Sequence, residues 1–293
     1  MEYSDSHVEF IHNKKDFVDQ SQIKYTKKQI SSTMIDKISP ELLFLACYNN
    51  PGKKSDYEDL LQIINSYRRV IKGHGWIMVK SKKDLSKDGI KIILHIENLG
   101  SIGCKLSRIK DLYKLGVRSI GLTHNELNQF AGGVNSSEGV SNLGWKAIDI
   151  MDQLGIILDL AHLGEKSLRQ VVSKDRKHLF VSHTGVKGVE KNKRNIGNDL
   201  LKYIGSSEGY VGVGFAGTFV GNPNSLDRIA EHIDYVSRLI GRDYVGIGSD
   251  LGGITSELPK GLNNISEVSN IIKIINDPGI QSRNLIRYVR SVL

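Results

Sequence analysis

The sequence predicts an α/β fold, a (β/α)₈ barrel of the TIM type, and two observations carry this prediction. Short apolar runs alternate with segments of helical periodicity between residues 42 and 247, and no change in composition interrupts the alternation. Short apolar runs with polar flanks are typical of buried parallel strands. With a first strand near the N-terminus, eight such runs can be counted, and eight parallel strands close a barrel of this type. An open, doubly wound sheet is the alternative architecture.

The length and charge of the chain limit its organisation and its partners. Barrels often reach 293 residues as one unit, so we predict a single domain over residues 1–293. The 40 Lys and Arg residues exceed the 32 Asp and Glu residues, for a formal net charge of +8. The lysines are scattered in pairs such as Lys14-Lys15 and Lys53-Lys54, with few aromatic residues among them. A nucleic-acid surface concentrates its charge on one face, so we expect no nucleic-acid partner.

The cysteines and the N-terminal residues indicate a cytoplasmic protein. Cys47 and Cys104 lie far apart, in or beside apolar segments, which favours reduced core thiols over a disulfide framework. No leader of charged and then apolar residues opens the chain, and its longest apolar run is Leu42 to Tyr48. A bilayer span needs roughly 18 apolar residues, so we expect no membrane association.

The first part of the chain predicts two strands and a helix. Residues 3–10 alternate polar and apolar side chains, and the apolar residues 42–48 end at a turn signal over residues 49–52. Residues 56–72 place apolar side chains at helical spacing. Residues 11–40 are polar and rich in lysine, so we expect a loop or an irregular lid there.

From residue 75 onward, strands and helices alternate, and a short extra strand is expected within residues 75–81. The further ring strands are expected at residues 90–96, 119–122, 156–160, 179–181, 210–215 and 244–247. The further helices are expected at residues 106–115, 143–154, 165–172, 198–204 and 225–240. Glycines alternate with apolar residues over 209–214 and 245–248, a pattern that fits strands bending round a barrel and does not match a dinucleotide-binding loop.

Histidines stand where two of the apolar runs stop. His162 follows the run at residues 156–160, and His183 follows the run at residues 179–181. The carboxyl ends of parallel strands form the face on which α/β proteins bind ligands. Two imidazoles on that face are either metal ligands and proton carriers or ordinary hydrogen-bonded residues.

Further donors at other strand ends favour a metal site on this face. They are His7 and Glu9, two apart on the first strand, and Glu97, His124 and Asp250. Imidazoles and carboxylates without a thiolate suit Zn²⁺ and related divalent ions. A bridging carboxylate allows two ions to lie about 3.5 to 4 Å apart and to activate one water.

Several segments carry a resemblance to a known family. They are Leu-Gly-Val-Arg-Ser-Ile-Gly-Leu-Thr-His-Asn at 115–125, Leu-Asp-Leu-Ala-His at 158–162, Val-Ser-His-Thr at 181–184, Lys-Arg-Asn-Ile-Gly-Asn-Asp-Leu-Leu at 193–201 and Val-Gly-Ile-Gly-Ser-Asp at 245–250. With His95-Ile96-Glu97 and Asp5-Ser6-His7-Val8-Glu9, they resemble the membrane (renal) dipeptidase family of zinc peptidases, whose bacterial members are soluble.

The resemblance implies the hydrolysis of dipeptides through a hydroxide that bridges two divalent metal ions, Zn²⁺ above all. It makes Glu97 the bridging ligand, and it assigns His7 and Glu9 to one ion and His162 and His183 to the other. The remaining roles that it implies are proton transfer by Asp250, oxyanion stabilisation and substrate binding by His124, and binding of the substrate carboxylate by Arg194. The family also suggests a homodimer.

Three departures from the family pattern leave alternatives open. Glu9 stands where the family has aspartate, Gly252 stands where a second aspartate is usual, and residues 98–100 replace a glycine-rich segment. The first concerns the occupancy of one metal site, and the other two concern the substrate. Another metal-dependent amidohydrolase or lactonase on the same scaffold is one alternative. A non-catalytic relative with a degenerate metal site is the other.

Overall fold

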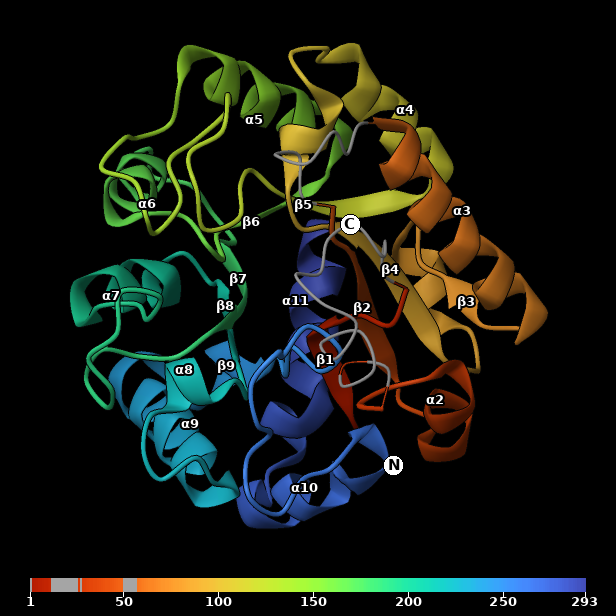
Figure 1. The fold of residues 1–293 in the computed structure, drawn as a ribbon, viewed down its shortest axis with the longest axis vertical. Coiled ribbons are helices and arrows are strands. Elements are labelled where there is room, and N and C mark those ends of the chain that lie inside the picture. Colours follow the sequence, from red (N-terminus) through yellow and green to blue (C-terminus); the bar gives the residue numbers. More distant parts are fainter. Residues whose placement is uncertain (1, 12–25, 27, 50–56) are drawn as a thin grey trace.

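The computed structural model describes residues 2–11, 26, 28–49 and 57–293, and it confirms the barrel. Eight parallel strands follow one another round a ring, and helices surround them (Figure 1). The ring strands are β1 (Ser4–Val8), β2 (Leu42–Cys47), β4 (Lys91–Ile96), β5 (Val117–Gly121), β6 (Ile157–Asp159), β7 (Phe180–Thr184), β8 (Tyr210–Val213) and β9 (Val245–Ile247). Outside the ring, β3 (Ile77–Met78) pairs with β4.

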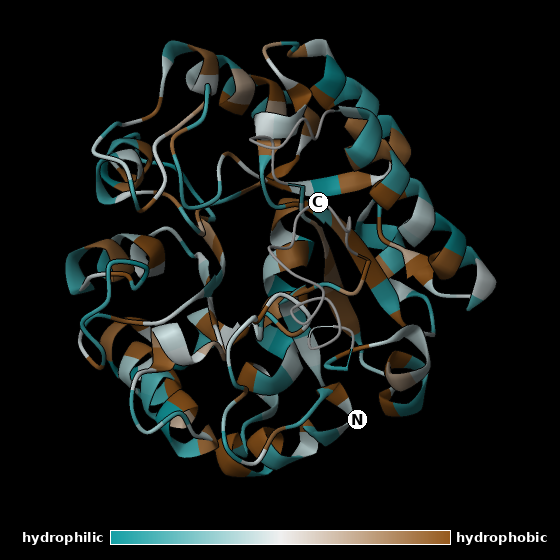
Figure 2. Ribbon diagram, in the orientation of Figure 1, coloured by the Kyte–Doolittle hydropathy of each residue, from teal (hydrophilic) through white to brown (hydrophobic). Residues whose placement is uncertain are grey.

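Helices alternate with the strands, and hydrophobic and hydrophilic residues are interspersed along them (Figure 2). They are α2 (Ser32–Ile38), α3 (Tyr57–Gly73), α4 (Ser107–Leu115), α5 (Asn142–Leu154), α6 (Glu165–Val172), α7 (Asn198–Ser206), α8 (Gly217–Val220), α9 (Leu226–Ile240), α10 (Ser269–Ile275) and α11 (Asn284–Val292). Local chemistry sets their ends: α5 begins where Ser141 caps the Gly144 N–H, and it ends at Gly155 in the left-handed conformation. Within the described part of the chain, no helix is both long and apolar enough to cross a membrane.

The structure corrects several expectations from the sequence. The segment expected to be a loop, residues 11–40, contains helix α2, whose buried residues are Ile35 and Ile38; residues 12–25 and 27 lie outside the described chain. Most of the turn expected at residues 49–52 also lies outside it. Helices α10 and α11 follow the last strand, and the sequence analysis did not assign them. Cys47 is buried, whereas Cys104 is exposed and not the core thiol that was expected.

The ring closes between β1 and the residues that follow β9. Val8 forms a parallel bridge with Leu251, and the Glu9 N–H donates to the Leu251 carbonyl at 3.0 Å. The Asp250 N–H donates to the His7 carbonyl at 2.9 Å. Closure therefore places Asp250 directly beside the end of β1.

Aromatic side chains and α11 fill the N-terminal end of the barrel. Phe180 and Tyr210 are the first residues of β7 and β8, and the Tyr288 ring from α11 stacks on Phe180 at 5.1 Å between centroids. Leu285 and Val289 of α11 join the same buried cluster. These side chains fill the interior of the barrel at this end, and the polar side chains at the strand ends gather at the opposite, C-terminal end.

Gly252 stands where the resembling family usually has an aspartate, and its surroundings explain the glycine. Its φ is +94°, and a Cβ atom there would lie 1.5 Å from the Glu9 carbonyl oxygen. Its N–H donates to Oε1 of Gln29 at 2.8 Å. The backbone of Gly252 lies too close to Glu9 to leave room for a side chain. A glycine is therefore required at this position, and an aspartate would clash.

We expect Gly252→Ala to lower the free energy of unfolding by about 2–3 kcal/mol, because the end of β1 must move to admit the methyl group. Urea denaturation measures this difference. The control is Gly73→Ala at the end of α3, where a Cβ would have no neighbouring atom within 4 Å, and it should be neutral or stabilising. Equal unfolding free energies for Gly252→Ala and the native protein would contradict the close approach.

Candidate active site

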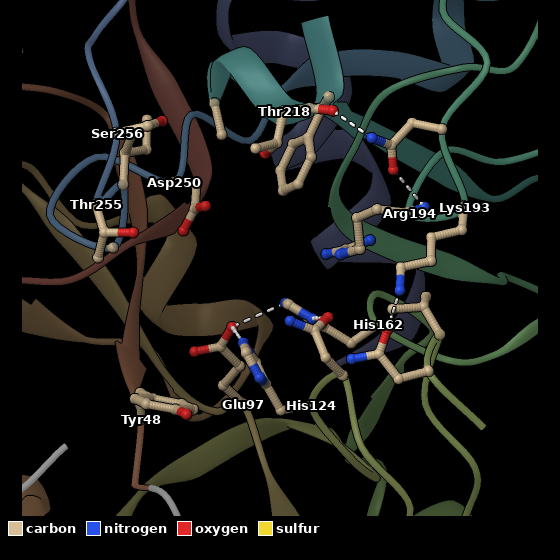
Figure 3. Close-up of a pocket in the computed structure, with 18 of the residues that line it drawn as sticks. Tyr48, Glu97, His124, His162, Lys193, Arg194, Thr218, Asp250, Thr255 and Ser256 are labelled. Carbon is tan, nitrogen blue, oxygen red and sulfur yellow. Dashed lines mark hydrogen bonds and ion pairs between the residues drawn. The ribbon is translucent and has the colours of Figure 1, made fainter. Parts of the chain in front are cut away.

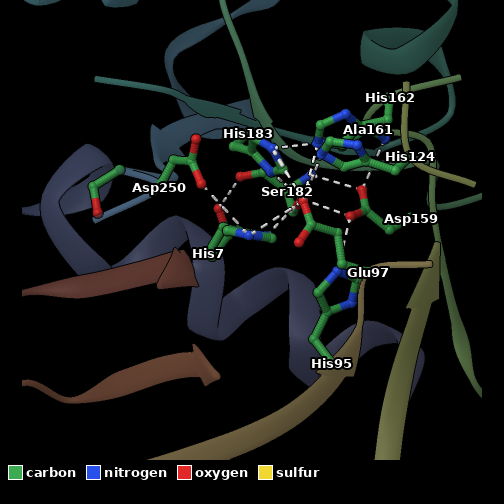
Figure 4. A network of polar contacts seen from close by, with 12 residues as sticks. His7, His95, Glu97, His124, Asp159, Ala161, His162, Ser182, His183 and Asp250 are labelled. Carbon is green, nitrogen blue, oxygen red and sulfur yellow. Dashed lines mark hydrogen bonds and ion pairs between the residues drawn. The ribbon is translucent and has the colours of Figure 1, made fainter. Parts of the chain in front are cut away.

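Histidine and carboxylate side chains from six strands meet at the C-terminal end of the ring (Figure 4). Four of the side chains follow their strands, whereas His7 and His183 are the next-to-last residues of β1 and β7. The sequence analysis expected His183 beyond its strand, and the structure corrects this. The residues are His7 of β1, Glu97 after β4, His124 after β5, His162 after β6, His183 of β7 and Asp250 after β9. Parallel strands deliver all of them to one edge because their carboxyl ends point the same way.

One oxygen of Glu97 lies between imidazoles from opposite sides of the ring. Its Oε1 is 3.0 Å from Nε2 of His162 and 4.0 Å from Nε2 of His183. The same oxygen is 3.8 Å from Nε2 of His7 and 3.9 Å from Nε2 of His124. A carboxylate in this position is suited to be shared by two cations.

The hydrogen-bond contacts of His162 indicate that a cation can bind among its Nε2 atom and the neighbouring acceptor atoms. Its Nδ1 lies 2.8 Å from Oδ1 of Asn125, an atom that only accepts, so Nδ1 carries the hydrogen and Nε2 carries a lone pair. That lone pair faces the Glu97 oxygen at 3.0 Å and Nε2 of His183 at 2.9 Å. Acceptors that face one another in a buried site repel unless a cation lies among them, so these residues fit a divalent ion.

Burial keeps the imidazoles neutral, which is the form that binds metals. Desolvation lowers the pKa of His7, His162 and His183 well below the usual range, and it lowers the pKa of His124 to about 3.

Burial acts in the opposite direction on the carboxyl groups. Desolvation raises the pKa of Glu97 well above its usual range, and it raises the pKa of Asp250 to about 7 although Arg194 opposes the shift. A bound divalent cation would favour the charged form of both carboxylates. The donor set therefore combines neutral nitrogen ligands with carboxylates that a cation would stabilise.

The described residues include three groups of potential ligand atoms, each group lying within 4.8 Å. The groups are His7 with His183 and Asp250, His7 with His95 and Asp159, and Glu97 with His124 and His162. Glu9 belongs to none of these groups. Its Oε1 instead lies near Asp250, since a Cβ at Gly253 would be 2.9 Å from Glu9 Oε1 and 2.6 Å from Asp250 Oδ1. The structure thus places Glu9 in the same cavity but beside the expected proton carrier.

His95 and Asp159 are buried polar residues of this region that the sequence analysis did not select. Nε2 of His95 lies 3.3 Å from Oδ2 of Asp159, beneath Glu97. A signal for each was present in the sequence. His95 is two residues before Glu97 and shares its side of the strand, and Asp159 is a lone acidic residue within an apolar run.

A cavity of about 520 Å³ opens above these side chains (Figure 3). Arg194 is buried in its wall, donates from Nη2 to the His183 carbonyl at 3.2 Å and lies 5.0 Å from the centre of the Phe219 ring. Desolvation lowers the pKa of Arg194 to about 10, so the guanidinium stays positively charged at neutral pH. Tyr48 and Lys193 also line the cavity, and neither was selected from the sequence.

Two of the site residues have backbone conformations that are unusual for residues with a side chain. The φ of His162 is +65°, and the φ of Asp250 is +66°. Such conformations cost on the order of 1–3 kcal/mol and gather at functional sites. The surrounding fold therefore holds these two side chains in place at an energetic cost.

Comparisons with known proteins match this chain along most of its length. The family model for membrane dipeptidase, peptidase family M19, matches residues 1–291. The uncharacterized dipeptidase C965.12 of Schizosaccharomyces pombe is 32% identical over 197 residues, which are 64% of this chain and 47% of that protein. Dipeptidase aclJ of Aspergillus oryzae is 30% identical over 264 residues, which are 83% of this chain and 62% of that protein. The chain thus spans about half of the length of the first of these curated relatives.

Solved structures share the fold at lower identity. A metallo peptidase from Rhodobacter sphaeroides, liganded with a phosphinate mimic of the dipeptide L-Ala-D-Ala, superposes with a TM-score of 0.87 at 18% identity, over 99% of both chains. An amidohydrolase from Pseudomonas aeruginosa gives a TM-score of 0.81 at 20% identity, over 99% of this chain and 96% of that one. With the family model matching nearly its full length, the chain belongs to the membrane dipeptidase family, peptidase family M19.

Proposed function

We propose that the protein is a metal-dependent dipeptidase. The observation that carries this proposal is the position of Glu97 Oε1, within 4.0 Å of the Nε2 atoms of His7, His162 and His183. Membership of the membrane dipeptidase family supports the same activity. The cavity above the site has room for a small substrate.

The proposed ligands divide between two divalent ions, with Zn²⁺ the ion that this donor set suits. Glu97, His162 and His183 would hold one ion, and Glu97, His7 and Glu9 would hold the other. Ions bound there would polarise a carbonyl and lower the pKa of a bound water from 15.7 toward about 7. Glu9 belongs to none of the ligand groups, so we expect the ion on the His7 side to be the more weakly held of the two.

The remaining side chains would position the substrate and move protons. Bound cations would keep the Asp250 carboxylate ionised, so it could accept a proton from the attacking water and return it to the leaving amine. His124 is neutral and would donate an N–H to the oxygen that becomes negatively charged. Arg194 would bind the free carboxylate of the dipeptide through two N–H groups.

Arg194 predicts a requirement for a free C-terminal carboxylate. A dipeptide should be cleaved with a kcat/KM about 10 to 100 times that of its C-terminal amide, because the amide loses a charge-assisted hydrogen-bonded pair. Initial rates on the matched pair of substrates measure the ratio. In Arg194→Lys the ratio should shrink, since lysine lacks the two-pronged contact. Equal kcat/KM values for the two substrates of the native protein would remove this role from Arg194.

A substrate panel tests the proposed function against its alternatives. We expect hydrolysis of dipeptides, abolished by a chelator and restored by a divalent ion. Turnover of cyclic amides or lactones with none of dipeptides would instead assign another amidohydrolase activity. Metal binding without turnover of any compound in the panel would indicate a non-catalytic relative. The predictions of a homodimer and of a cytoplasmic location do not bear on this test.

A further inference from the structure

The hydroxyl group of Ser182 lies close to the imidazoles of His7 and His183, which come from β1 and β7 (Figure 4). Ser182 precedes His183 in β7 and is fully buried. Its Oγ donates to Oδ2 of Asp159 at 2.5 Å. The same Oγ lies 2.9 Å from Nδ1 of His183 and 3.5 Å from Nδ1 of His7. One hydroxyl thus contacts a carboxylate and two histidines.

The direction of these hydrogen bonds follows from the number of hydrogens available. The other oxygen of Asp159, Oδ1, already accepts the N–H groups of Ala161 at 3.0 Å and of Ser182 at 2.9 Å. Asp159 is therefore the acceptor, and the single hydrogen of the Ser182 hydroxyl points at its Oδ2. Because Ser182 donates its only hydroxyl hydrogen to Asp159, its Oγ can act only as an acceptor toward the two imidazoles. His183 and His7 must therefore each carry a hydrogen on Nδ1.

This arrangement leaves both Nε2 atoms with a lone pair that faces the candidate metal site. Nε2 of His7 has no hydrogen-bond partner among the described residues, and it lies 3.8 Å from Glu97 Oε1. Nε2 of His183 lies 4.0 Å from the same oxygen, and the two imidazole rings are 4.0 Å apart between centroids. Both lone pairs thus lie near the carboxylate that the two proposed ions would share.

We propose that Ser182, held by Asp159, is a positioning residue that fixes the Nδ1–H tautomer of both His7 and His183. Through them, one hydroxyl group prepares a nitrogen ligand for each of the two ions. The inference rests on the proposed function only in that the site binds divalent metal. Groups of this kind, hydrogen-bonded to metal ligands, change metal affinity by about 10 to 100-fold when they are removed.

A purely structural role for Ser182 is the competing explanation. The Ser182 N–H also bonds to Asp159 and ties β7 to β6. Ser182→Ala keeps this backbone bond and removes only the hydroxyl. A loss of stability without a loss of metal affinity would therefore indicate packing alone.

The first test measures Zn²⁺ affinity of the metal-free protein by competition with a chromophoric chelator. We expect Ser182→Ala to bind Zn²⁺ about 10 to 100 times more weakly than the native protein. Ser182→Thr, which retains a hydroxyl, should recover most of the affinity. The matched control is Ser4→Ala, another buried strand serine, whose Oγ bonds to Ser282 at 2.8 Å; its affinity should equal that of the native protein. Native affinity in Ser182→Ala would overturn the proposal.

The second test observes the tautomers directly, in the metal-free protein with ¹⁵N-labelled histidine. Long-range proton–nitrogen correlation spectra should show His7 and His183 protonated on Nδ1 in the native protein, and a changed tautomer ratio in Ser182→Ala. Nε2–H tautomers for both residues in the native protein would contradict the proposal. These readouts need no substrate, so a protein that cleaves no dipeptide would refute the proposed function and leave this inference standing.

Discussion

The variant His183→Ala is expected to lose dipeptide hydrolysis by on the order of 10³-fold or more and to bind less metal, while it stays folded. Its Nε2 lies 2.9 Å from Nε2 of His162 and 4.0 Å from Glu97 Oε1, so the substitution removes one of the three proposed ligands of one ion. The neutral imidazole provides no charge that the fold needs, and its side chain lies above the packed end of the barrel.

Elemental analysis, kcat/KM on a dipeptide and thermal unfolding of the metal-free variant measure these effects together. The control is His74→Ala, an exposed histidine at the end of α3 that pairs with Asp36 at 2.6 Å. Such a surface pair contributes little, so the control should match the native protein in all three measurements. Full metal content and a native rate in His183→Ala would show that this histidine is not a ligand.

The variant Asp250→Asn is expected to lower kcat by about 10² to 10⁴-fold with its metal retained, because the amide cannot carry the proton. Asp250 lies 3.7 Å from Nε2 of His7, and closure of the barrel at Leu251 fixes its position. The same distance would also allow it to act as a metal ligand, so kcat and metal content must be measured on the same sample.

Asp243→Asn is the matched control, since it makes the same change in an exposed residue just before β9. It should leave both quantities unchanged. Loss of an ion from Asp250→Asn would assign Asp250 to the ligands, and an unchanged kcat would remove it from the reaction. Either result contradicts its role as the proton carrier.

Much of the fold was predictable because each ring strand is a short apolar run between polar segments. The helices that were missed explain the limits of this pattern. In α2 two buried residues, Ile35 and Ile38, stand in a lysine-rich segment, so the apolar face is too narrow to identify. In α11 the contacts of Leu285 and Tyr288 are with strand residues far away in the sequence. That α11 packs against the N-terminal end of the barrel becomes evident only when the closed ring of strands is known.

The outer members of the site were predictable because strand ends converge in a parallel barrel. The hydrogen-bonded layer beneath them was not, because it depends on how neighbouring strands align. The pairing register shifts between Asp5 and Val8, between Leu94 and His95, and between Val181 and Thr184. Such irregularities often turn side chains at active sites, and here they flank or include the residues of the site. Their positions depend on contacts between strands that the order of residues does not reveal.

Titration of the metal-free protein with Zn²⁺, with dipeptide hydrolysis measured at each ratio, tests the central claim most directly. We predict no turnover without metal, an increase as ions bind, and a plateau at two ions per chain. Restoration of the rate by added metal would indicate that a metal ion held by the buried imidazoles and Glu97 takes part in hydrolysis. A rate that is unaffected by removal of metal, or no hydrolysis of any dipeptide at saturating Zn²⁺, would contradict the assignment as a metal-dependent dipeptidase.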